Sequence, residues 1–475
     1  MKFDFTNLGL IDHAELELGP LTLICGENNT GKTYVTYAIY GLLRSWRNLL
    51  VMAIGNEIDS VAARKGTYKV DLQEMFSGQV NPYLEKLTAK YTEYLPKVFG
   101  AGDSLFTKAR VGIHIDAERD ILPLSFQRSI KKGPAGQVLA TVVKEAGSPV
   151  LETLVADDTW VRSPFSGLSD FVVDAIGDIV FSHYLPDTFI ASAERTGAAI
   201  FRKELDFART RMIEALGTLD TKELRNPVRL LQSMEVDYAW PVQDNVDFVR
   251  QLETIDKQTG PLAKAHPELV AAFEAIIGGS YKVIKDKGLV FQPKGAGKPR
   301  LSMTESSSSV RALLDIGFYL RCQAKSGDLF MIDEPELNLH PTNQRALARL
   351  LARMVNHGVR VFITTHSDYL VKEINSLIML AQRTPWTRRV QESRGYVEEE
   401  LLSPDQVRLY MTCTASDGRN GKNKRARINT LRQATIYPDQ GIEVTTFDTT
   451  IEEMNNIQGE ILYGADDAFS AGDTA

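Results

Sequence analysis

The chain has 475 residues, a net charge of −7 at pH 7, and 43% apolar and 24% charged residues. This length allows two to four domains, and the acidic balance excludes a general attraction to nucleic acid. No stretch approaches the roughly 18 uncharged apolar residues of a membrane helix, and the N-terminus lacks the apolar run of a signal peptide. We therefore expect a cytoplasmic protein without membrane contact.

The first 45 residues predict a strand, loop and helix after a short hairpin. Apolar side chains alternate over residues 3–10 and 14–18, which predicts two paired strands. Residues 21–25 form a nearly continuous apolar run, typical of a strand buried on both faces. A glycine-containing loop follows, and residues 34–43 carry apolar side chains at helical spacing.

The middle of the chain predicts a mixed insertion and then a helix-rich segment. We expect a helix over 82–98 and strands over 111–115 and 137–143. A core strand should run from 188 into a turn near 197, followed by helices over 198–258, most clearly over 202–216. Residues 283–301 predict paired strands around a Gly-Ala-Gly-Lys turn at 295–298.

From residue 301 to about 374 the pattern alternates helix, strand, helix, strand, helix. Strands are expected over 407–413 and 427–437, with a loose acidic tail from residue 463. The division expected is an N-terminal lobe of an ATPase head (1–45), an insertion (46–185), a head strand with a helical arm (186–284), the second head lobe (285–375) and a β-rich C-terminal extension (376–475).

The loop at residues 26–33 reads Gly-Glu-Asn-Asn-Thr-Gly-Lys-Thr and matches the phosphate-loop pattern at every fixed position. Backbone N–H groups of such a loop and the following helix N-terminus face an anion. The lysine reaches the β- and γ-phosphates, and the threonine hydroxyl binds Mg²⁺. The nucleotide-binding residues expected are Gly26, Asn28, Asn29, Thr30, Gly31, Lys32 and Thr33.

Two later apolar strands end in polar residues suited to the same site. Residues 329–332 lead into Asp333, which suits Mg²⁺ binding, and Glu334, which suits a general base that polarises water. Residues 359–365 lead into His366, a candidate sensor of the γ-phosphate. About 300 residues separate Lys32 from Asp333, much more than in compact phosphate-loop folds.

These motifs resemble those of ABC-type ATPases of the SMC, RecF and OLD group. Residues 332–341 resemble a Walker B motif that runs into a D-loop, and residues 364–367 resemble an H-loop. Residues 305–310 occupy the place of the signature motif, with serines where glycines are usual. The D-loop residues implied are Asn338, Leu339 and His340, and the signature residues implied are Ser307, Ser308 and Ser309.

The resemblance implies an α/β fold, an ABC-type head with a mixed sheet flanked by helices and a large insertion between the Walker A and signature motifs. It also implies ATP hydrolysis with Mg²⁺. The signature motif acts in trans in such proteins, so a head-to-tail homodimer or a higher oligomer of dimers is expected, with two ATP molecules at its interface.

Residues 191–197 resemble a motif of the OLD-like branch, which includes the ATPase subunits of the Septu and PARIS anti-phage systems. Arg195 within it is a candidate contact to nucleotide or to the dimer partner, with a structural salt bridge as the alternative. No Toprim motif is recognised after His366, and no HNH-like cluster is recognised among the seven histidines. The resemblance therefore implies an ATPase that senses infection through a nucleic acid or a phage protein, and controls a separate effector, expected to be a Toprim- or HNH-type nuclease encoded nearby.

Two other functions remain open, a DNA-binding repair ATPase of the RecF or SMC type and an OLD-like nuclease with an unrecognised active site. A basic cluster between the last two strands bears on this choice, because it suits nucleic acid, an acidic partner protein or only solvent. Its residues are Arg419, Lys422, Lys424, Arg425 and Arg427.

Overall fold

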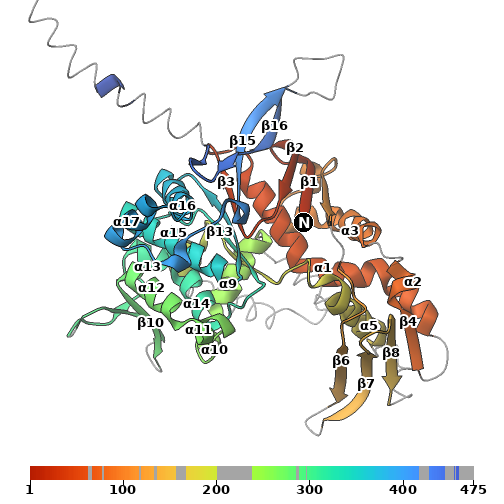
Figure 1. Cartoon of the computed structure of the whole chain (residues 1–475). Coiled ribbons are helices and arrows are strands. Elements are labelled where there is room, and N and C mark those ends of the chain that lie inside the picture. Colours follow the sequence, from red (N-terminus) through yellow and green to blue (C-terminus); the bar gives the residue numbers. More distant parts are fainter. Residues whose placement is uncertain are drawn as a thin grey trace, which may run out of the picture.

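The computed structural model describes residues 1–62, 67–76, 80–116, 119–132, 136–156, 167–200, 238–284, 288–295, 297–416, 427–443, 454 and 456–458. Its centre is a six-stranded sheet with helices on both faces, and a smaller lobe of strands projects to one side (Figure 1). The predicted fold class, a mixed sheet flanked by helices, is confirmed. Within the described residues, no helix is both long and apolar enough to cross a membrane.

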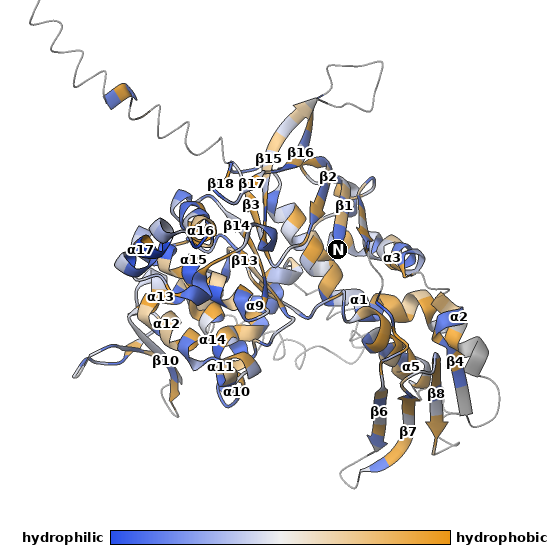
Figure 2. Ribbon diagram, viewed as in Figure 1, coloured by the Kyte–Doolittle hydropathy of each residue, from blue (hydrophilic) through white to orange (hydrophobic). Residues whose placement is uncertain are grey.

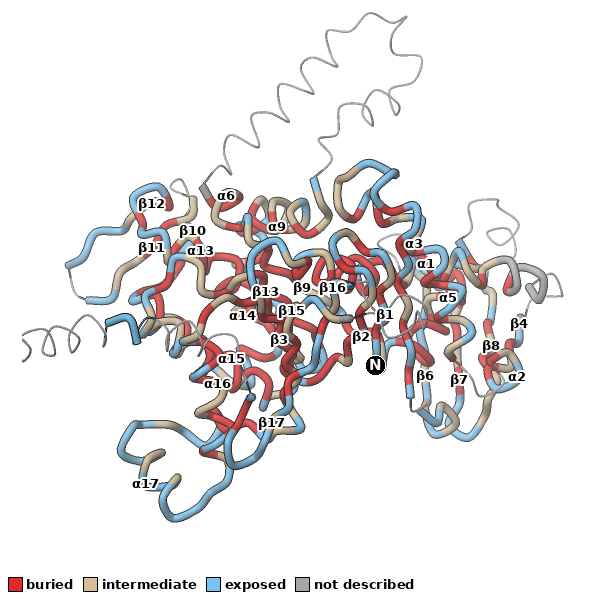
Figure 3. The backbone as a smooth tube through the Cα atoms, turned by 90° about the horizontal axis from the view of Figure 1, so that it is seen from above, coloured by how far each residue is buried: buried red, intermediate tan, exposed pale blue. Residues whose placement is uncertain are grey.

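The central sheet has the strand order β16-β15-β3-β14-β13-β9. Its strands are β3 (Leu21–Cys25), β9 (Thr188–Ala191), β13 (Leu329–Asp333), β14 (Arg360–Thr365), β15 (Val407–Ser416) and β16 (Arg427–Gln433). The first five are mutually parallel, and β16 returns antiparallel along β15. All residues of β3 and β13 are buried, which explains their continuous apolar sequences (Figure 3).

Alternate residues of these strands face two separate hydrophobic cores. Leu329 and Met331 of β13 belong to the first core, and Phe330 and Ile332 belong to the second. The first core contains residues of β1 (Lys2–Leu8), β2 (Ile11–Glu17), α1 (Lys32–Ala62), α3 (Asn81–Phe99), β5 (Arg110–His114) and α5 (Leu168–Ile176). The expected hairpin of β1 and β2 is confirmed, and β5 pairs with β1 on its other side.

The helices of the second core cover the opposite face of the sheet. They are α6 (Arg195–Ile200), α9 (Trp240–Arg250), α10 (Leu252–Ile255), α11 (Pro261–Ala265), α12 (Pro267–Ile277), α13 (Ser308–Ala312), α14 (Leu314–Cys322), α15 (Pro341–Asn356) and α16 (Asp368–Leu380). Strands β10 (Gly279–Ile284), β11 (Gly288–Pro293) and β12 (Leu301–Ser302) form an antiparallel sheet beside them. The turn expected at 295–298 lies in the connection from β11 to β12.

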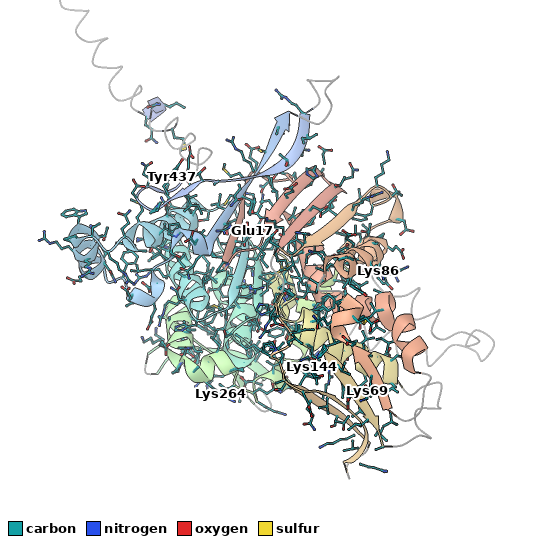
Figure 4. All side chains as sticks on the ribbon, turned by 45° about the vertical axis from the view of Figure 1, so that its right-hand side comes forward. Glu17, Lys69, Lys86, Lys144, Lys264 and Tyr437 are labelled. Atoms are coloured by element: carbon teal, nitrogen blue, oxygen red, sulfur yellow. The ribbon has the colours of Figure 1, made fainter. Side chains whose placement is uncertain are left out.

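The projecting lobe is an antiparallel sheet with the strand order β4-β8-β7-β6 (Figure 1). Its elements are β4 (Thr67–Asp71), α2 (Leu72–Phe76), β6 (Phe126–Lys132), β7 (Gln137–Lys144) and β8 (Val150–Val155). Lys144, labelled in Figure 4, is only 1% exposed, and its ammonium donates to the carbonyls of Leu122, Leu124 and Glu145. The lobe is therefore only part of the predicted insertion over 46–185, since β5 of that range pairs with β1, and the lobe packs on the head through the first core.

The C-terminal part adds strands and one outlying helix. Helix α17 (Pro385–Arg394) has no buried residue and is largely hydrophilic in Figure 2. Short strands β17 (Ile436–Tyr437) and β18 (Gly441–Ile442) form a hairpin, and β18 contacts α16. The expected strands over 407–413 and 427–437 correspond to β15 and to β16 with β17, and β15 pairs with β3 inside the central sheet.

Two element predictions need correction. The helix expected over 34–43 extends over 31 residues, because buried side chains continue at helical spacing through Trp46, Leu50 and Ile54. The first helix expected after residue 301 is two helices, α13 and α14, with a break at Leu313. The domain division stays a prediction, and its boundaries at 45 and 375 fall inside α1 and α16. The helix expected over 202–216 and the tail from 463 lie outside the described residues.

Candidate functional site

The predicted phosphate loop joins β3 to α1 with two glycines in conformations that other residues rarely adopt. Gly26 has φ 147° and Gly31 has φ 98°. A Cβ on Gly26 would lie 1.8 Å from Thr412 Oγ1, and one on Gly31 would lie 2.8 Å from Ile11 Cδ1. The two glycines therefore permit both the turn of the loop and its close packing against β15 and β2.

Lys32 is folded back onto its own loop. Its Nζ donates to the carbonyl oxygens of Gly26 at 3.0 Å and Glu27 at 2.7 Å. Burial lowers the pKa of this ammonium, while the carboxylates of Glu334 and Asp333 oppose the shift. Thr33 is exposed at the start of α1. A phosphate group that enters the loop would replace two weak carbonyl partners of Lys32 with a charged one.

Asp333 ends β13 and is 3% exposed. Its neighbour across the parallel pair is Thr364 of β14, whose hydroxyl donates to the Asp333 carboxylate. Burial raises the pKa of Asp333 to about 6, against the lowering effect of the Thr364 hydrogen bond. A buried carboxylate with this cost of ionisation suits a divalent cation, because a cation favours the ionised form.

Glu334 follows Asp333 in a left-handed conformation, with φ 51°. Its backbone N–H points to the carbonyl oxygen of Thr364 at 3.1 Å and to the Thr364 hydroxyl oxygen at 3.2 Å. The Glu334 carboxylate and the His366 ring lie together, with Oε1 and Nε2 3.4 Å apart. The structure thus brings the predicted base and the predicted sensor into one pair at the carboxyl ends of β13 and β14.

Backbone strain also marks this region. Five non-glycine residues in the described part of the chain have φ between 51° and 60°, and three of them are predicted site residues, Asn29, Glu334 and Asn338. Asparagine adopts this conformation readily, whereas for Glu334 it costs free energy and persists because the surroundings impose it, often at functional sites. Their concentration here supports the assignment of these loops to one functional site.

Glu336 is a site residue that the sequence prediction missed. Its Oε1 accepts hydrogen bonds from the Thr365 hydroxyl at 2.9 Å and from the backbone N–H of His366 at 2.6 Å. The carboxylate therefore connects the loop after β13 to the loop after β14 and positions His366. The available signal was its place two residues after Glu334, within the segment already recognised as the Walker B and D-loop motif.

Arg195 is 1% exposed, and its guanidinium is a buried clamp. It donates over 2.6–2.8 Å to four backbone carbonyls, those of Ser192, Ala312, Asp333 and Glu334. This position leaves the side chain no surface for a nucleotide or a partner, so that expectation is corrected. The alternative, a structural role, agrees with this position. The partners that Arg195 contacts are backbone carbonyl oxygens, however, and not the carboxylate of a salt bridge.

Asp315 supplies the compensating charge near this clamp. It is buried on α14, and neither carboxylate oxygen has a hydrogen-bond partner among the described residues. Burial raises the pKa of Asp315 to about 7, and the nearby Arg195 charge opposes that shift. Arg195, at the start of α6, is therefore hydrogen-bonded to the end of α13 and to the end of β13, which carries Asp333. These hydrogen bonds are buried, so water does not compete for them.

Strand β15 contributes a second missed residue, Thr412. Its hydroxyl donates to the Thr30 hydroxyl at 2.7 Å and lies 3.5 Å from the Cys25 carbonyl. A nearby link joins β16 to the start of β2, where the backbone N–H of Asn429 donates to the Asp12 carboxylate at 2.7 Å. The β15–β16 hairpin thus contacts both the phosphate loop and β2, although β15 and the phosphate loop are nearly 390 residues apart in the sequence.

The signature serines lie at the start of α13, on the face of the sheet opposite α1. Ser307 caps the helix by accepting from the Val310 N–H at 3.3 Å, and Ser307 and Ser308 are exposed.

The three residues of the predicted D-loop differ in their surroundings. Asn338 is exposed to solvent. Leu339 is a core residue, and His340 caps α15 by accepting from Thr342 N–H.

The basic cluster is mostly beyond what the structure describes. Arg419, Lys422, Lys424 and Arg425 lie outside the described residues, and Arg427 is exposed at the start of β16. Its binding role stays a prediction.

Residues 193–371 match the family model for AAA ATPase domains. This range includes Arg195, Asp333, Glu334 and His366 and excludes the phosphate loop at 26–33. No curated protein matches the chain at a significant level.

The solved structures that resemble this chain distantly include three SMC head domains. The Smc head bound to the C-winged-helix domain of ScpA is 13% identical, with 91% of this chain and 97% of that chain covered and a TM-score of 0.34. The Pyrococcus furiosus Smc head with an extended coiled coil, bound to the C-terminal domain of ScpA, is 12% identical over 96% and 98%, with a TM-score of 0.32. The Thermotoga maritima SMC head is 8% identical over 92% and 98%, with a TM-score of 0.29. The chain is therefore similar over residues 193–371 to AAA ATPase domains, on an α/β fold with a phosphate loop between β3 and α1.

Proposed function

We propose that this chain binds ATP with Mg²⁺ and hydrolyses it at the site formed by the phosphate loop, Asp333, Glu334 and His366. The observation that carries the proposal is the convergence of these residues at the carboxyl ends of adjacent parallel strands β3, β14 and β13. Ligands of α/β proteins bind at this edge of a sheet. Lys32 and the loop N–H groups would bind the phosphates, and Glu334 would polarise the attacking water.

The residues also fit a magnesium ion. Thr33 offers an exposed hydroxyl, and Asp333 offers a buried carboxylate with one oxygen already oriented by Thr364. When bound, Mg²⁺ neutralises charge on the phosphates. The left-handed Glu334 directs its side chain toward His366, so both remain beside the expected γ-phosphate position.

The proposed ATP site is completed by a second copy of the chain. Ser307 and Ser308 are exposed at the start of α13, in the lobe on the opposite face of the sheet from α1. An exposed helix start with hydroxyl and N–H donors suits a phosphate of a nucleotide held by another protomer. A head-to-tail homodimer would place these serines against the partner's phosphate loop and enclose two ATP molecules.

Control of a separate effector, a nuclease, in anti-phage defence is the biological role that we propose. It is supported by the resemblance of residues 191–197 to the OLD-like branch. Arg195 in this motif holds the backbone of both Asp333 and Glu334, so the motif is physically connected to the hydrolytic residues. A movement at α6 and the residues before it could therefore report the nucleotide state to a bound partner.

The test is expression of the tagged chain together with its flanking genes. We expect a neighbouring gene product to co-purify, and Glu334→Gln to retain that complex in the presence of ATP. No co-purifying product, together with steeply salt-dependent DNA binding by the purified chain, would instead support the RecF or SMC type of function. Metal-dependent DNA cleavage by the purified chain that survives Glu334→Gln would support a nuclease.

A further inference from the structure

Three metal-ligating side chains meet at the end of the sheet opposite the ATP site. His266 lies between α11 and α12, Glu268 is in the first turn of α12, and His357 follows the last residue of α15. Strand β14 begins at Arg360, soon after His357, and His366 follows its far end. Lys264, labelled in Figure 4, marks the region of α11 next to the cluster.

The donor atoms are already grouped. One ligand atom from each of the three residues lies within 4.8 Å of the others. The Nδ1 of His266 and the Oε1 of Glu268 are 3.1 Å apart. The rings of His266 and His357 stack with centroids 3.6 Å apart and planes inclined by 27°.

One of these donors has no other use in the described structure. The Nε2 atom of His357 is buried without a hydrogen-bond partner among the described residues. Buried polar atoms are normally paired, and an exception needs an explanation such as an absent ion or water. A metal ion would occupy the lone pair of this nitrogen.

The spacing suits a tetrahedral ion. Donors about 2.0–2.2 Å from zinc lie about 3.3 Å from one another in tetrahedral geometry. The His266–Glu268 separation of 3.1 Å fits this value. The His357 donor lies within 4.8 Å of the other two, and its ring must turn out of the stack with His266 to direct a nitrogen lone pair at the same ion.

The charges around the cluster also accept a cation. Glu268 carries one negative charge, and the guanidinium of Arg353, the positive group facing the cluster, is 3.3 Å from the Glu399 carboxylate. Two imidazoles and one carboxylate favour zinc and related transition metals over Mg²⁺ or Ca²⁺, which prefer oxygen ligands.

We propose that His266, Glu268 and His357 bind one transition-metal ion of the zinc class, with water as the fourth ligand. The ion would fasten the start of α12 to the end of α15. These helices are already joined at the opposite end of their contact, where the Asn343 amide donates to the Ile276 carbonyl at 3.1 Å. The site would therefore fix the helical lobe that carries α13 and its serines to the helix that follows the D-loop. This inference does not rest on ATP hydrolysis.

The experiment is a Zn²⁺ titration of the full-length, chelator-treated chain by calorimetry, followed by Co²⁺ absorption spectroscopy. We expect one ion per chain, tetrahedral Co²⁺ bands, and a melting temperature raised by zinc. His266→Ala, His357→Ala and Glu268→Gln should each weaken binding by at least about 10-fold. His183→Ala, which changes an exposed histidine outside the cluster, should bind zinc like the wild type.

Two results would overturn the proposal. One is a wild-type chain that binds no zinc, in which case the two rings stack without an ion. The other is equal zinc affinity in the wild type and all three cluster variants, which would place the ion elsewhere. Glu268 is exposed, so Glu268→Gln keeps the test valid if a histidine variant fails to fold. Zinc binding is measured without nucleotide, so this test and that of the proposed function fail independently.

Discussion

Replacing Arg195 with methionine should be among the most destabilising single changes in the head. Methionine retains the length of the side chain and removes the guanidinium donors to four carbonyls, of which that of Ser192 keeps the Arg195 backbone N–H. Each buried acceptor left without a partner costs about 1–3 kcal/mol. Asp315 would also lose its nearby positive charge. Because the groups share one network and their costs do not add, we expect a loss of about 3–5 kcal/mol in the free energy of unfolding.

The assay is urea unfolding followed by circular dichroism, with Arg383→Met as the matched control. Arg383 forms an ion pair with Glu398, and its side chain is 61% exposed. The same substitution there should cost no more than about 1 kcal/mol. The double variant Arg195→Met with Asp315→Leu should recover part of the loss, because it removes the uncompensated buried carboxylate together with its partner.

A second readout separates the clamp from general stability. Arg195 holds the carbonyls of Asp333 and Glu334, so the folded fraction of Arg195→Met should also hydrolyse ATP more slowly than the wild type. Equal stability of Arg195→Met and Arg383→Met, with normal turnover, would refute the role assigned to the clamp.

Three further predictions concern residues around the site. Burial raises the pKa of Asp315 to about 7 from 3.8 in the unfolded chain, so the wild type should lose stability as the pH rises from about 4 to 7. Asp315→Asn should therefore gain up to about 4 kcal/mol relative to the wild type across that window, measured as unfolding free energies at pH 4.5 and pH 8. Glu336→Ala removes the acceptor that orients His366, and should lower kcat about 10-fold or more with KM for ATP nearly unchanged, in steady-state assays. Thr412→Val removes one hydrogen bond to Thr30 and should raise KM for ATP about fivefold, whereas Thr414→Val, which alters a contact to Asn429 on the exposed hairpin, should leave it unchanged.

Local motifs made the nucleotide side of the site predictable. The phosphate loop, Asp333, Glu334 and His366 each sit at the end of an apolar strand, and that pattern is contained within about ten residues. The strands β3, β13 and β14 were identifiable for the same reason. The start of α1 was predicted as well, but its continuation past residue 43 was not, although Trp46, Leu50 and Ile54 keep the helical spacing.

Relations between distant segments were not predictable from the same patterns. The pairing of β15 with β3 decides that Thr412 contacts Thr30, and no local feature of either strand specifies that partner. The motif around Arg195 suggested contact with a nucleotide or a partner. Its actual partners, the carbonyls of Ala312, Asp333 and Glu334, are more than 110 residues away in the sequence, so no local pattern predicts them. The role of Glu336 is not visible in its own motif, because the donors to its carboxylate come from the last residue of β14 and from His366 after it.

The composite site between two copies is tested most directly by mixing two inactive variants. Lys32→Ala should lose ATP binding at its own phosphate loop, and Ser307→Arg with Ser308→Arg should block the surface presented to a partner. In a head-to-tail dimer, each mixed pair contains one site with an intact phosphate loop and intact serines. An equal mixture should recover about a quarter of the wild-type ATPase rate, because about half of randomly formed dimers are mixed and each has one working site of two. No recovery above the two separate variants, with mixed dimers demonstrated by differential tags, would contradict a site shared between chains.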